Sequence, residues 1–521
     1  MKLKNNQKKL MIYALLTNYA IYMCMYLFFY ATYESQLDIM MQAALYGVSG
    51  MASAHILYTN VILGWILKPL ISAMPGVNWY YMYLAMTSVL ALSVISYILI
   101  KRADNKIGRT VAFVISCFLG YECYVLPGAM KTAGVVAVAL LLLLADSYEM
   151  GAMKKSARKI VLLMMAAFGS MVQLSAFLVT LLIGSICLIL YYTVFHFEGG
   201  TEKWSEQIRN FMKSEQAKHF MMLLGAMFMI VVLLYAVDDF SYRFSGRETA
   251  VAYRGTMCRM YGYGLGEYDA DVAEQYGIDE SGFSSLKTGN FAVQDEQTLE
   301  HVRDLVAHSD KWSAAKVNRY FKSVPIGLFK YGIFYLFIIM LFMLFYSPRG
   351  QKKALVWSEI AMLIAVTLVE YLFNAWGYNW VAVITVFALV LPLMLALKDA
   401  KEVEYKYLWV YLAVFSVILY SKFASGMVSS VAEEDMQAKF ASVDTSKCNV
   451  IDLNAYLKRF SSQHYYAPGL LYQDSVSITN GAYYLMDGYA DKILKGVDGN
   501  LTYQWMYNPY NLDVWGVWLE Q

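Results

Sequence analysis

The chain has 521 residues, of which 59% are hydrophobic and only 16% are charged. Long apolar runs alternate with short basic loops, which is typical of a helical membrane protein and excludes a soluble globular fold. The net charge of +2 gives no sign of nucleic-acid binding, because lysine and arginine cluster at the ends of the apolar runs. We therefore expect a membrane protein with lipid, and no nucleic acid, as its partner.

Apolar runs of membrane-spanning length predict an all-α membrane domain of about 11 transmembrane helices. The first run is too long for a signal-peptide core and has no clear small-residue cleavage site, so we interpret it as a retained span. The predicted spans cover residues 10–32, 79–100, 110–126, 132–146, 160–173, 175–195, 219–237, 326–346, 356–373, 380–397 and 407–424.

Short basic loops predict the orientation of these spans. Residues 101–109, 153–159, 347–353 and 398–406 are basic and fall on one side of the membrane, together with the Lys-rich N-terminus. Lysine and arginine concentrate in cytoplasmic loops, so this side is expected to be cytoplasmic. The protein is then a multi-pass plasma-membrane protein with its C-terminus outside the cell.

The segment 33–78 forms the first external loop in this arrangement. Its run from residue 55 to residue 74 is long enough for a further span, but counting it would move the basic 101–109 loop outside. Its polar residues, which include His55 and Lys68, suit two amphipathic helices lying along the outer membrane surface.

The topology divides the chain into four parts. Residues 1–237 form a module of about seven spans, residues 238–325 a large external loop, residues 326–424 about four further spans, and residues 425–521 a mixed external C-terminal region. The tyrosine and tryptophan side chains of the tail suit the core of a small domain, contact with lipid headgroups or stacking on sugar rings. Cys258 and Cys448 both lie outside, and either a disulfide or two free thiols is compatible with the sequence.

The sequence has no Walker A loop, Rossmann fingerprint or nucleophile elbow, so nucleotide-driven transport is not expected. A substrate delivered by the membrane itself fits the composition better.

A series of landmarks then gives a family resemblance. Asp38 follows the first span, and H-I-L-Y-T-N-V-I-L-G (55–64) and P-G-V-N-W-Y (75–80) lead into the second span. L-P-G-A-M-K-T-A-G-V-V (126–136) opens the fourth span, and R-M-Y-G-Y-G-L-G-E-Y-D (259–269) lies in the large external loop. Over residues 10–305 the chain resembles bacterial GT-C-type membrane glycosyltransferases of surface-polysaccharide pathways.

The resemblance implies an enzyme that transfers a sugar from a polyprenyl-phosphate-linked donor to a glycan or glycolipid acceptor on the outer face. Asp38 matches the acidic residue that acts as a base or helps to hold a metal, and Glu34, one helical turn earlier, is its candidate partner. The cofactor stays unknown, with a divalent cation as one alternative. A solvated helix cap or an interfacial carboxylate is the structural alternative for Asp38.

The leaving lipid phosphate calls for cations or oriented donors near the outer surface. Lys131 ranks first, although a basic residue beside a span often contacts only lipid headgroups. The other candidate substrate-binding residues are polar or charged and are expected near the same surface: His55, Arg243, Arg247, Arg254 and Glu370. Where related proteins often carry an arginine at the outer end of the fifth and sixth spans, this chain has Gln173.

Three other functions compete with the transferase. A polysaccharide polymerase would share the substrate and the large external loop, and a transporter or flippase of lipid-linked saccharides would need a polar cavity in the bundle. Transporters commonly have internal repeats and paired broken helices, and the sequence shows no matching halves. A structural scaffold is the remaining alternative.

Overall fold

The computed structural model describes the first half of the chain and parts of the remainder. The described residues are 2–29, 31, 33, 38, 41–42, 45–46, 52–56, 58–75, 77–103, 106–190, 192, 209, 211–246, the single residues 251, 275, 304, 417, 420, 423 and 424, and four strands between 448 and 519. The chain divides into two compact units. The first holds Met1–Phe28, Tyr83–Asp238 and Ser313–Ala424, and the second holds Phe29–Met82, Asp239–Trp312 and Ser425–Gln521.

Long helices coincide with the first seven predicted spans. They are α1 (Lys2–Phe28), α4 (Trp79–Ala103), α5 (Lys106–Gly120), α6 (Ala129–Glu149), α7 (Ser156–Val172), α8 (Leu174–Leu190) and α10 (Glu215–Phe244). Among the described residues, α6, α10 and the main parts of α1 and α4 are long and apolar enough to cross a membrane. The four spans predicted between residues 326 and 424 lie, apart from single residues, outside the described part.

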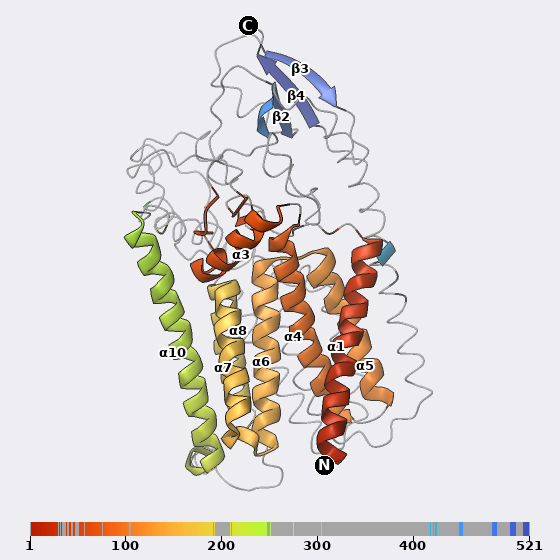
Figure 1. Cartoon of the computed structure of the whole chain (residues 1–521), viewed down its shortest axis with the longest axis vertical. Coiled ribbons are helices and arrows are strands. Elements are labelled where there is room, and N and C mark those ends of the chain that lie inside the picture. The colour runs from red at the N-terminus through yellow and green to blue at the C-terminus, as the bar shows by residue number, and fades with distance from the viewer. Residues whose placement is uncertain are drawn as a thin grey trace. The chain divides into compact units, whose positions relative to one another are not determined.

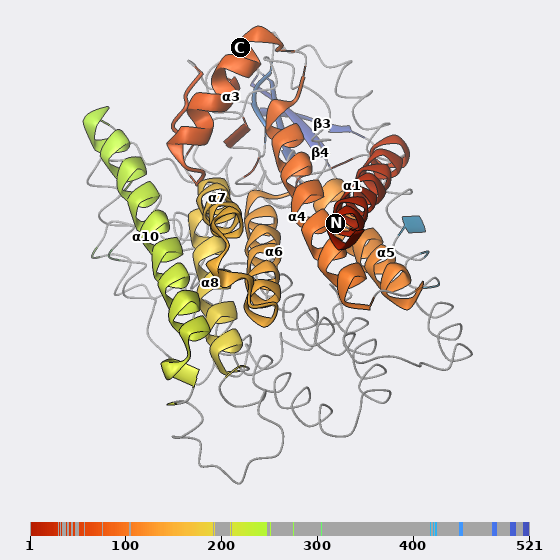
Figure 2. The same cartoon turned by 60° about the horizontal axis from the view of Figure 1, so that its bottom comes forward.

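Helix α6 forms the centre of the first unit. The apolar stretch of α6 is 94% buried inside the protein, whereas the apolar stretches of α1 and α10 are each 28% buried. It stands between α4 on one side and α7 and α8 on the other (Figures 1 and 2). The exposed faces of α1 and α10 carry large apolar side chains such as Leu16, Phe28 and Leu233. Such faces suit hydrocarbon, because lipid tails are as apolar as these side chains.

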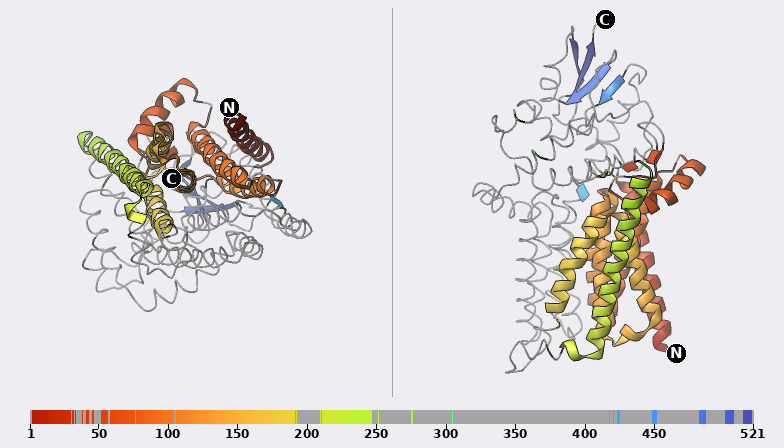
Figure 3. Two further views of the ribbon diagram at one scale, coloured as in Figure 1. Left: turned by 90° about the horizontal axis from the view of Figure 1, so that it is seen from below. Right: turned by 90° about the vertical axis from the view of Figure 1, so that its left-hand side faces the viewer.

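Polar contacts join the helices inside this unit. The Asn18 amide donates to the Ser96 hydroxyl at 3.1 Å, and Ser96 lies 2.7 Å from the Ser116 hydroxyl, so α1, α4 and α5 share one buried polar chain. Successive helices from α4 to α8 run in alternating directions, and Figure 3 views them end-on and from the side. The connection between α7 and α8 is the single residue Gln173, whose side-chain oxygen accepts from the backbone N–H of Ala176 at 2.6 Å.

The second unit contains helix α3 (Val61–Ala73), which begins where the Asn60 side chain accepts from the N–H of Ile62 at 3.0 Å. Its 13 residues span about 20 Å, less than the roughly 30 Å of a hydrocarbon core. Gly64 lets the chain before α3 pass closely, because a Cβ there would lie 1.9 Å from the carbonyl oxygen of Ala54. The placement of this segment along a membrane surface stays a prediction.

Four strands of the C-terminal region form one sheet. They are β1 (Cys448–Ile451), β2 (Ala482–Met486), β3 (Leu501–Met506) and β4 (Val514–Leu519), in the order β1-β2-β4-β3. Strands β1 and β2 are parallel, and β4 is antiparallel to both β2 and β3. The register places Trp505 opposite Trp515. Part of the aromatic tail therefore belongs to a sheet. The proposed partner of Cys448, Cys258, lies outside the described residues.

Candidate functional site

Asp38 is buried in the second unit. It lies on helical backbone beyond the end of α1, and its side chain is only 2% exposed. Its Oδ1 atom accepts a hydrogen bond of 2.9 Å from the hydroxyl of Tyr80, which is fully buried in the first turn of α4. Buried polar groups keep their place only when they are hydrogen-bonded, so the start of α4 orients this carboxylate.

Apolar and aromatic groups surround the contact between Asp38 and Tyr80. The sulfur of Met41 lies 3.7 Å from the Tyr80 hydroxyl and 3.2 Å from the hydroxyl of Thr59. The ring of Tyr33 packs against that of Tyr80, with ring centroids 5.8 Å apart. A carboxylate shielded from water in this way is suited to accept a proton from a substrate hydroxyl.

A second set of hydrogen bonds is centred on Gln42, four positions after Asp38 in the sequence. The side-chain oxygen of Gln42 accepts from the Tyr33 hydroxyl at 2.5 Å and from the Asn78 amide at 3.2 Å. The Asn78 oxygen in turn accepts from the backbone N–H of Tyr81 at 3.0 Å. We call the residues of both sets the Asp38 cluster: Tyr33, Asp38, Met41, Gln42, Thr59, Asn78 and Tyr80.

His55 joins the first loop to the C-terminal end of α10. Its Nε2 atom lies 3.1 Å from the Ser241 hydroxyl and 3.4 Å from that of Ser245. Its ring meets the Tyr242 ring edge-on at 4.8 Å. These contacts fix the side chain of His55 against α10, and they give it a structural role whatever else it binds.

Lys131 lies in the first unit, in the first turn of α6, and is 4% exposed. Its ammonium group donates to the carbonyl oxygens of Glu122 and Leu126, both at 2.9 Å, and to the Glu122 carboxylate at 3.1 Å. Glu122 belongs to the π-helical turn η1 (Tyr121–Val125) that follows α5. The lysine therefore ties α6 to this turn through three acceptors.

The remaining candidates are exposed or lie beyond the described residues. Arg243 is in the last turn of α10 rather than after the helix, is 63% exposed and pairs with Asp239 at 2.8 Å. Among the described residues no group of three or more His, Cys, Asp or Glu side chains is placed to hold a metal ion. The candidates outside the described residues are Glu34, Arg247, Arg254 and Glu370.

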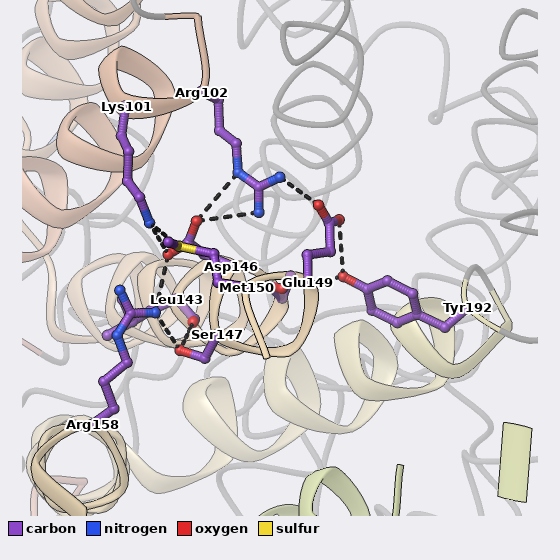
Figure 4. A network of polar contacts seen from close by, with 10 residues as sticks. Lys101, Arg102, Leu143, Asp146, Ser147, Glu149, Met150, Arg158 and Tyr192 are labelled. Carbon is purple, nitrogen blue, oxygen red and sulfur yellow. Dashed lines mark hydrogen bonds and ion pairs between the residues drawn. The ribbon is translucent and has the colours of Figure 1, made fainter. Parts of the chain in front are cut away.

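A further polar cluster occupies one end of the bundle (Figure 4). Asp146, fully buried near the end of α6, pairs with Lys101 at 2.6 Å, Arg102 at 3.2 Å and Arg158 at 3.1 Å. Glu149 pairs with Arg102 and accepts from the Tyr192 hydroxyl at 3.2 Å. We call these residues the Asp146 cluster: Lys101, Arg102, Asp146, Glu149, Arg158 and Tyr192. The cluster joins the ends of α4 and α6 to the beginning of α7.

Sequence reasoning missed most partners in both clusters. The sequence places Asn78 and Tyr80 only in the segment P-G-V-N-W-Y that leads into the second span, although an asparagine directly before a helical run signals a helix start. Asp146 and Glu149 close an apolar run whose neighbouring loops are basic, and this opposite charge was the available signal for an ion pair. Nothing in the local pattern around Gln42 marks it as part of a site.

The apolar helices place this chain in the class of helical membrane proteins. No protein-family model matches the sequence, and no curated protein sequence matches it either. A search of solved structures finds the crystal structure of ArnT from Cupriavidus metallidurans bound to undecaprenyl phosphate. The alignment covers 97% of each chain at 8% identity with a TM-score of 0.36. A TM-score of this size does not establish a common fold.

Proposed function

We propose that this protein is an integral-membrane glycosyltransferase that moves a sugar from a polyprenyl-phosphate-linked donor to a glycan or glycolipid acceptor on the outer face. The observation that carries the proposal is the environment of Asp38. This carboxylate follows a helix able to cross a membrane, is 2% exposed and is oriented by the Tyr80 hydroxyl. The sequence resemblance to GT-C enzymes at the first external loop supports the same assignment.

The chemistry proposed for Asp38 is general-base catalysis. Its carboxylate takes the proton of an acceptor hydroxyl as that oxygen forms a bond to the anomeric carbon of the donor sugar. The bond between the anomeric carbon and the phosphate oxygen breaks, and the polyprenyl phosphate leaves with the electron pair. The hydrogen bond from the Tyr80 hydroxyl to Oδ1 holds the carboxylate in place for this proton transfer.

A lipid donor suits a protein built largely from apolar helices, because the donor reaches the protein through the bilayer. Lys131 remains the cation that we propose for the lipid phosphate. Its ammonium group is already held by two backbone carbonyls and the Glu122 carboxylate. The two carbonyls are backbone groups and stay in place. The Glu122 side chain is 14% exposed and is the acceptor that a phosphate oxygen can replace.

The substitution Asp38→Asn tests the proposed base. Asparagine keeps the size of the side chain and an oxygen for the Tyr80 hydroxyl, but it cannot take a proton. Transfer of a labelled hexose from undecaprenyl phosphate to cell-envelope acceptors, measured with purified protein in lipid nanodiscs, should fall roughly 100-fold or more. The matched control is Glu215→Gln, which changes an acidic residue that is 68% exposed.

Two outcomes would contradict the proposal. Folded Asp38→Asn protein that transfers the sugar at the wild-type rate would remove the catalytic assignment. Wild-type protein that transfers nothing but moves the labelled lipid across the bilayer would place the transporter alternative first.

A further inference from the structure

The orientation of the Gln42 side-chain amide follows from a chain of hydrogen bonds. The backbone N–H of Tyr81 can only donate, so the Asn78 atom that faces it is the oxygen, and the other end of that amide is NH₂. The Asn78 NH₂ group can also only donate, so the Gln42 atom that faces it is Oε1. The Tyr33 hydroxyl donates to the same oxygen. The Gln42 NH₂ group must therefore point away from both partners.

No described residue accepts a hydrogen bond from this NH₂ group. Gln42 is 1% exposed, and its two hydrogen bonds within the described part of the chain both use Oε1. Most buried polar side-chain atoms have a partner, because leaving a donor without one costs its hydration. The described neighbours thus hold the Gln42 amide in place without accepting from its two N–H donors, which is the arrangement expected of a ligand-binding group.

Gln42 also lies close to the proposed base. Asp38 and Gln42 are four positions apart in the sequence, and each lies on helical backbone. The tyrosine that orients Asp38 and the tyrosine that orients Gln42 pack against each other, with ring centroids 5.8 Å apart. The cluster therefore contains an acceptor, the Asp38 carboxylate, and a donor, the Gln42 amide, that are held by two tyrosines in contact. A sugar offers the same pair in reverse, because one hydroxyl can donate while a neighbouring oxygen accepts.

We infer that the Gln42 amide binds an oxygen atom of the substrate sugar beside Asp38 and so contributes to recognition of the sugar. This inference rests on the proposed function. Gln42 is then a specificity residue. Its fixed N–H groups raise the affinity for a sugar with an oxygen at one position and do not raise the affinity for the bare lipid phosphate.

The substitution Gln42→Glu tests this role. A carboxylate still accepts from Tyr33 and Asn78 but has lost both N–H donors. The probes are undecaprenyl phosphate and undecaprenyl-phosphate hexose, with binding to purified full-length protein measured by native mass spectrometry. The ratio of the two affinities cancels any repulsion between the new charge and the phosphate. This ratio should fall about tenfold from its wild-type value.

A second variant tests the same role without changing residue 42. In Asn78→Asp the side chain keeps an acceptor for Tyr81 but offers Gln42 a second acceptor in place of a donor. The Gln42 amide should then turn its NH₂ group toward residue 78 and away from the sugar, and the affinity ratio should again fall. The control is Glu215→Gln, at an exposed residue of α10 outside the cluster, and its affinity ratio should equal that of the wild type.

The outcomes separate this inference from the proposed function. Wild-type protein that binds the two lipids equally well would contradict both. Wild-type protein that prefers the sugar-bearing lipid, together with Gln42→Glu and Asn78→Asp variants that keep this preference, would overturn the role of Gln42 alone.

Discussion

Lys131 illustrates how much a single buried charge can contribute to the first unit. Its three donors meet two carbonyls and one carboxylate around the π-helical turn, and the side chains of Lys131 and Glu122 are only 5% and 14% exposed. A π-helical turn leaves carbonyls displaced from regular α-helical partners, and such turns often occur at functional sites. The lysine donates to two carbonyls and to the acid beside them, so the residue that we propose for the lipid phosphate also stabilises this turn.

The substitution Lys131→Met should therefore destabilise the protein even before any effect on lipid phosphate is measured. Methionine keeps the length of the side chain but removes the donors and leaves Glu122 without its cation. Removing one partner of a buried ion pair costs about 3 kcal/mol, and the apparent melting temperature in detergent should fall by several degrees. Restoration of part of this loss by adding Glu122→Gln would confirm that the ion pair is its source.

The control for this change is Lys218→Met on α10. Lys218 pairs with Glu215 at 3.4 Å, but the two side chains are 63% and 68% exposed. Exposed pairs contribute about 0 to 1 kcal/mol, so this variant should melt close to wild type. Equal melting temperatures for Lys131→Met and wild type would show that the buried pair contributes little.

Among the helices, the sequence predicted where each one lies in the chain but did not predict where it ends or which residues it contacts. Apolar runs located α1, α4, α5, α6, α7, α8 and α10, because membrane-spanning helices need long apolar segments. Their ends depend on single side chains. Gln173 separates α7 from α8, and α10 continues to Phe244, beyond the predicted end at residue 237. The sequence indicated Asp38 as a candidate base. Its burial and its partner Tyr80, 42 positions away, come only with folding.

In the Asp146 cluster, one carboxylate near the end of α6 forms ion pairs with the end of α4 and the start of α7. Asp146 is fully buried and meets Lys101, Arg102 and Arg158. In Asp146→Asn these three cations would lose their shared countercharge, at a cost of several kcal/mol. Hydrogen–deuterium exchange should increase at the C-terminal ends of α4 and α6 and at the start of α7, whereas α1 should exchange as in wild type.

A second substitution tests whether charge is the cause. Arg158 is the most exposed of the three cations, at 23%, and Arg158→Gln removes one excess positive charge from the Asp146→Asn background. The double variant should recover part of the lost protection. An Asp146→Asn exchange pattern that matches wild type at all three helix ends would mean that packing alone holds them together.

At the scale of the whole molecule, the Asp146 cluster bears on membrane orientation. It brings the end of α4 and the start of α7 together, so the basic loops 101–109 and 153–159 lie at one end of the bundle, where α1 also begins (Figure 1). Such a concentration of lysine and arginine favours the cytoplasmic side. The helices α1, α4, α5, α6, α7, α8 and α10 make an odd number of crossings if each spans the membrane. The C-terminal ends of α1 and α10 should therefore both lie on the outer side, where we propose that the reaction takes place.

Cysteine labelling in intact cells tests this orientation. In a variant without the natural cysteines, Lys154→Cys in the basic loop should resist a membrane-impermeant maleimide until the cells are permeabilised. Glu248→Cys, four residues beyond the end of α10, should react in intact cells because residues 238–325 are predicted to be external. Labelling of Lys154→Cys from outside together with protection of Glu248→Cys would show that the protein has the opposite orientation in the membrane. Asp38 would then face the cytoplasm, and an acceptor on the outer surface could not be its substrate.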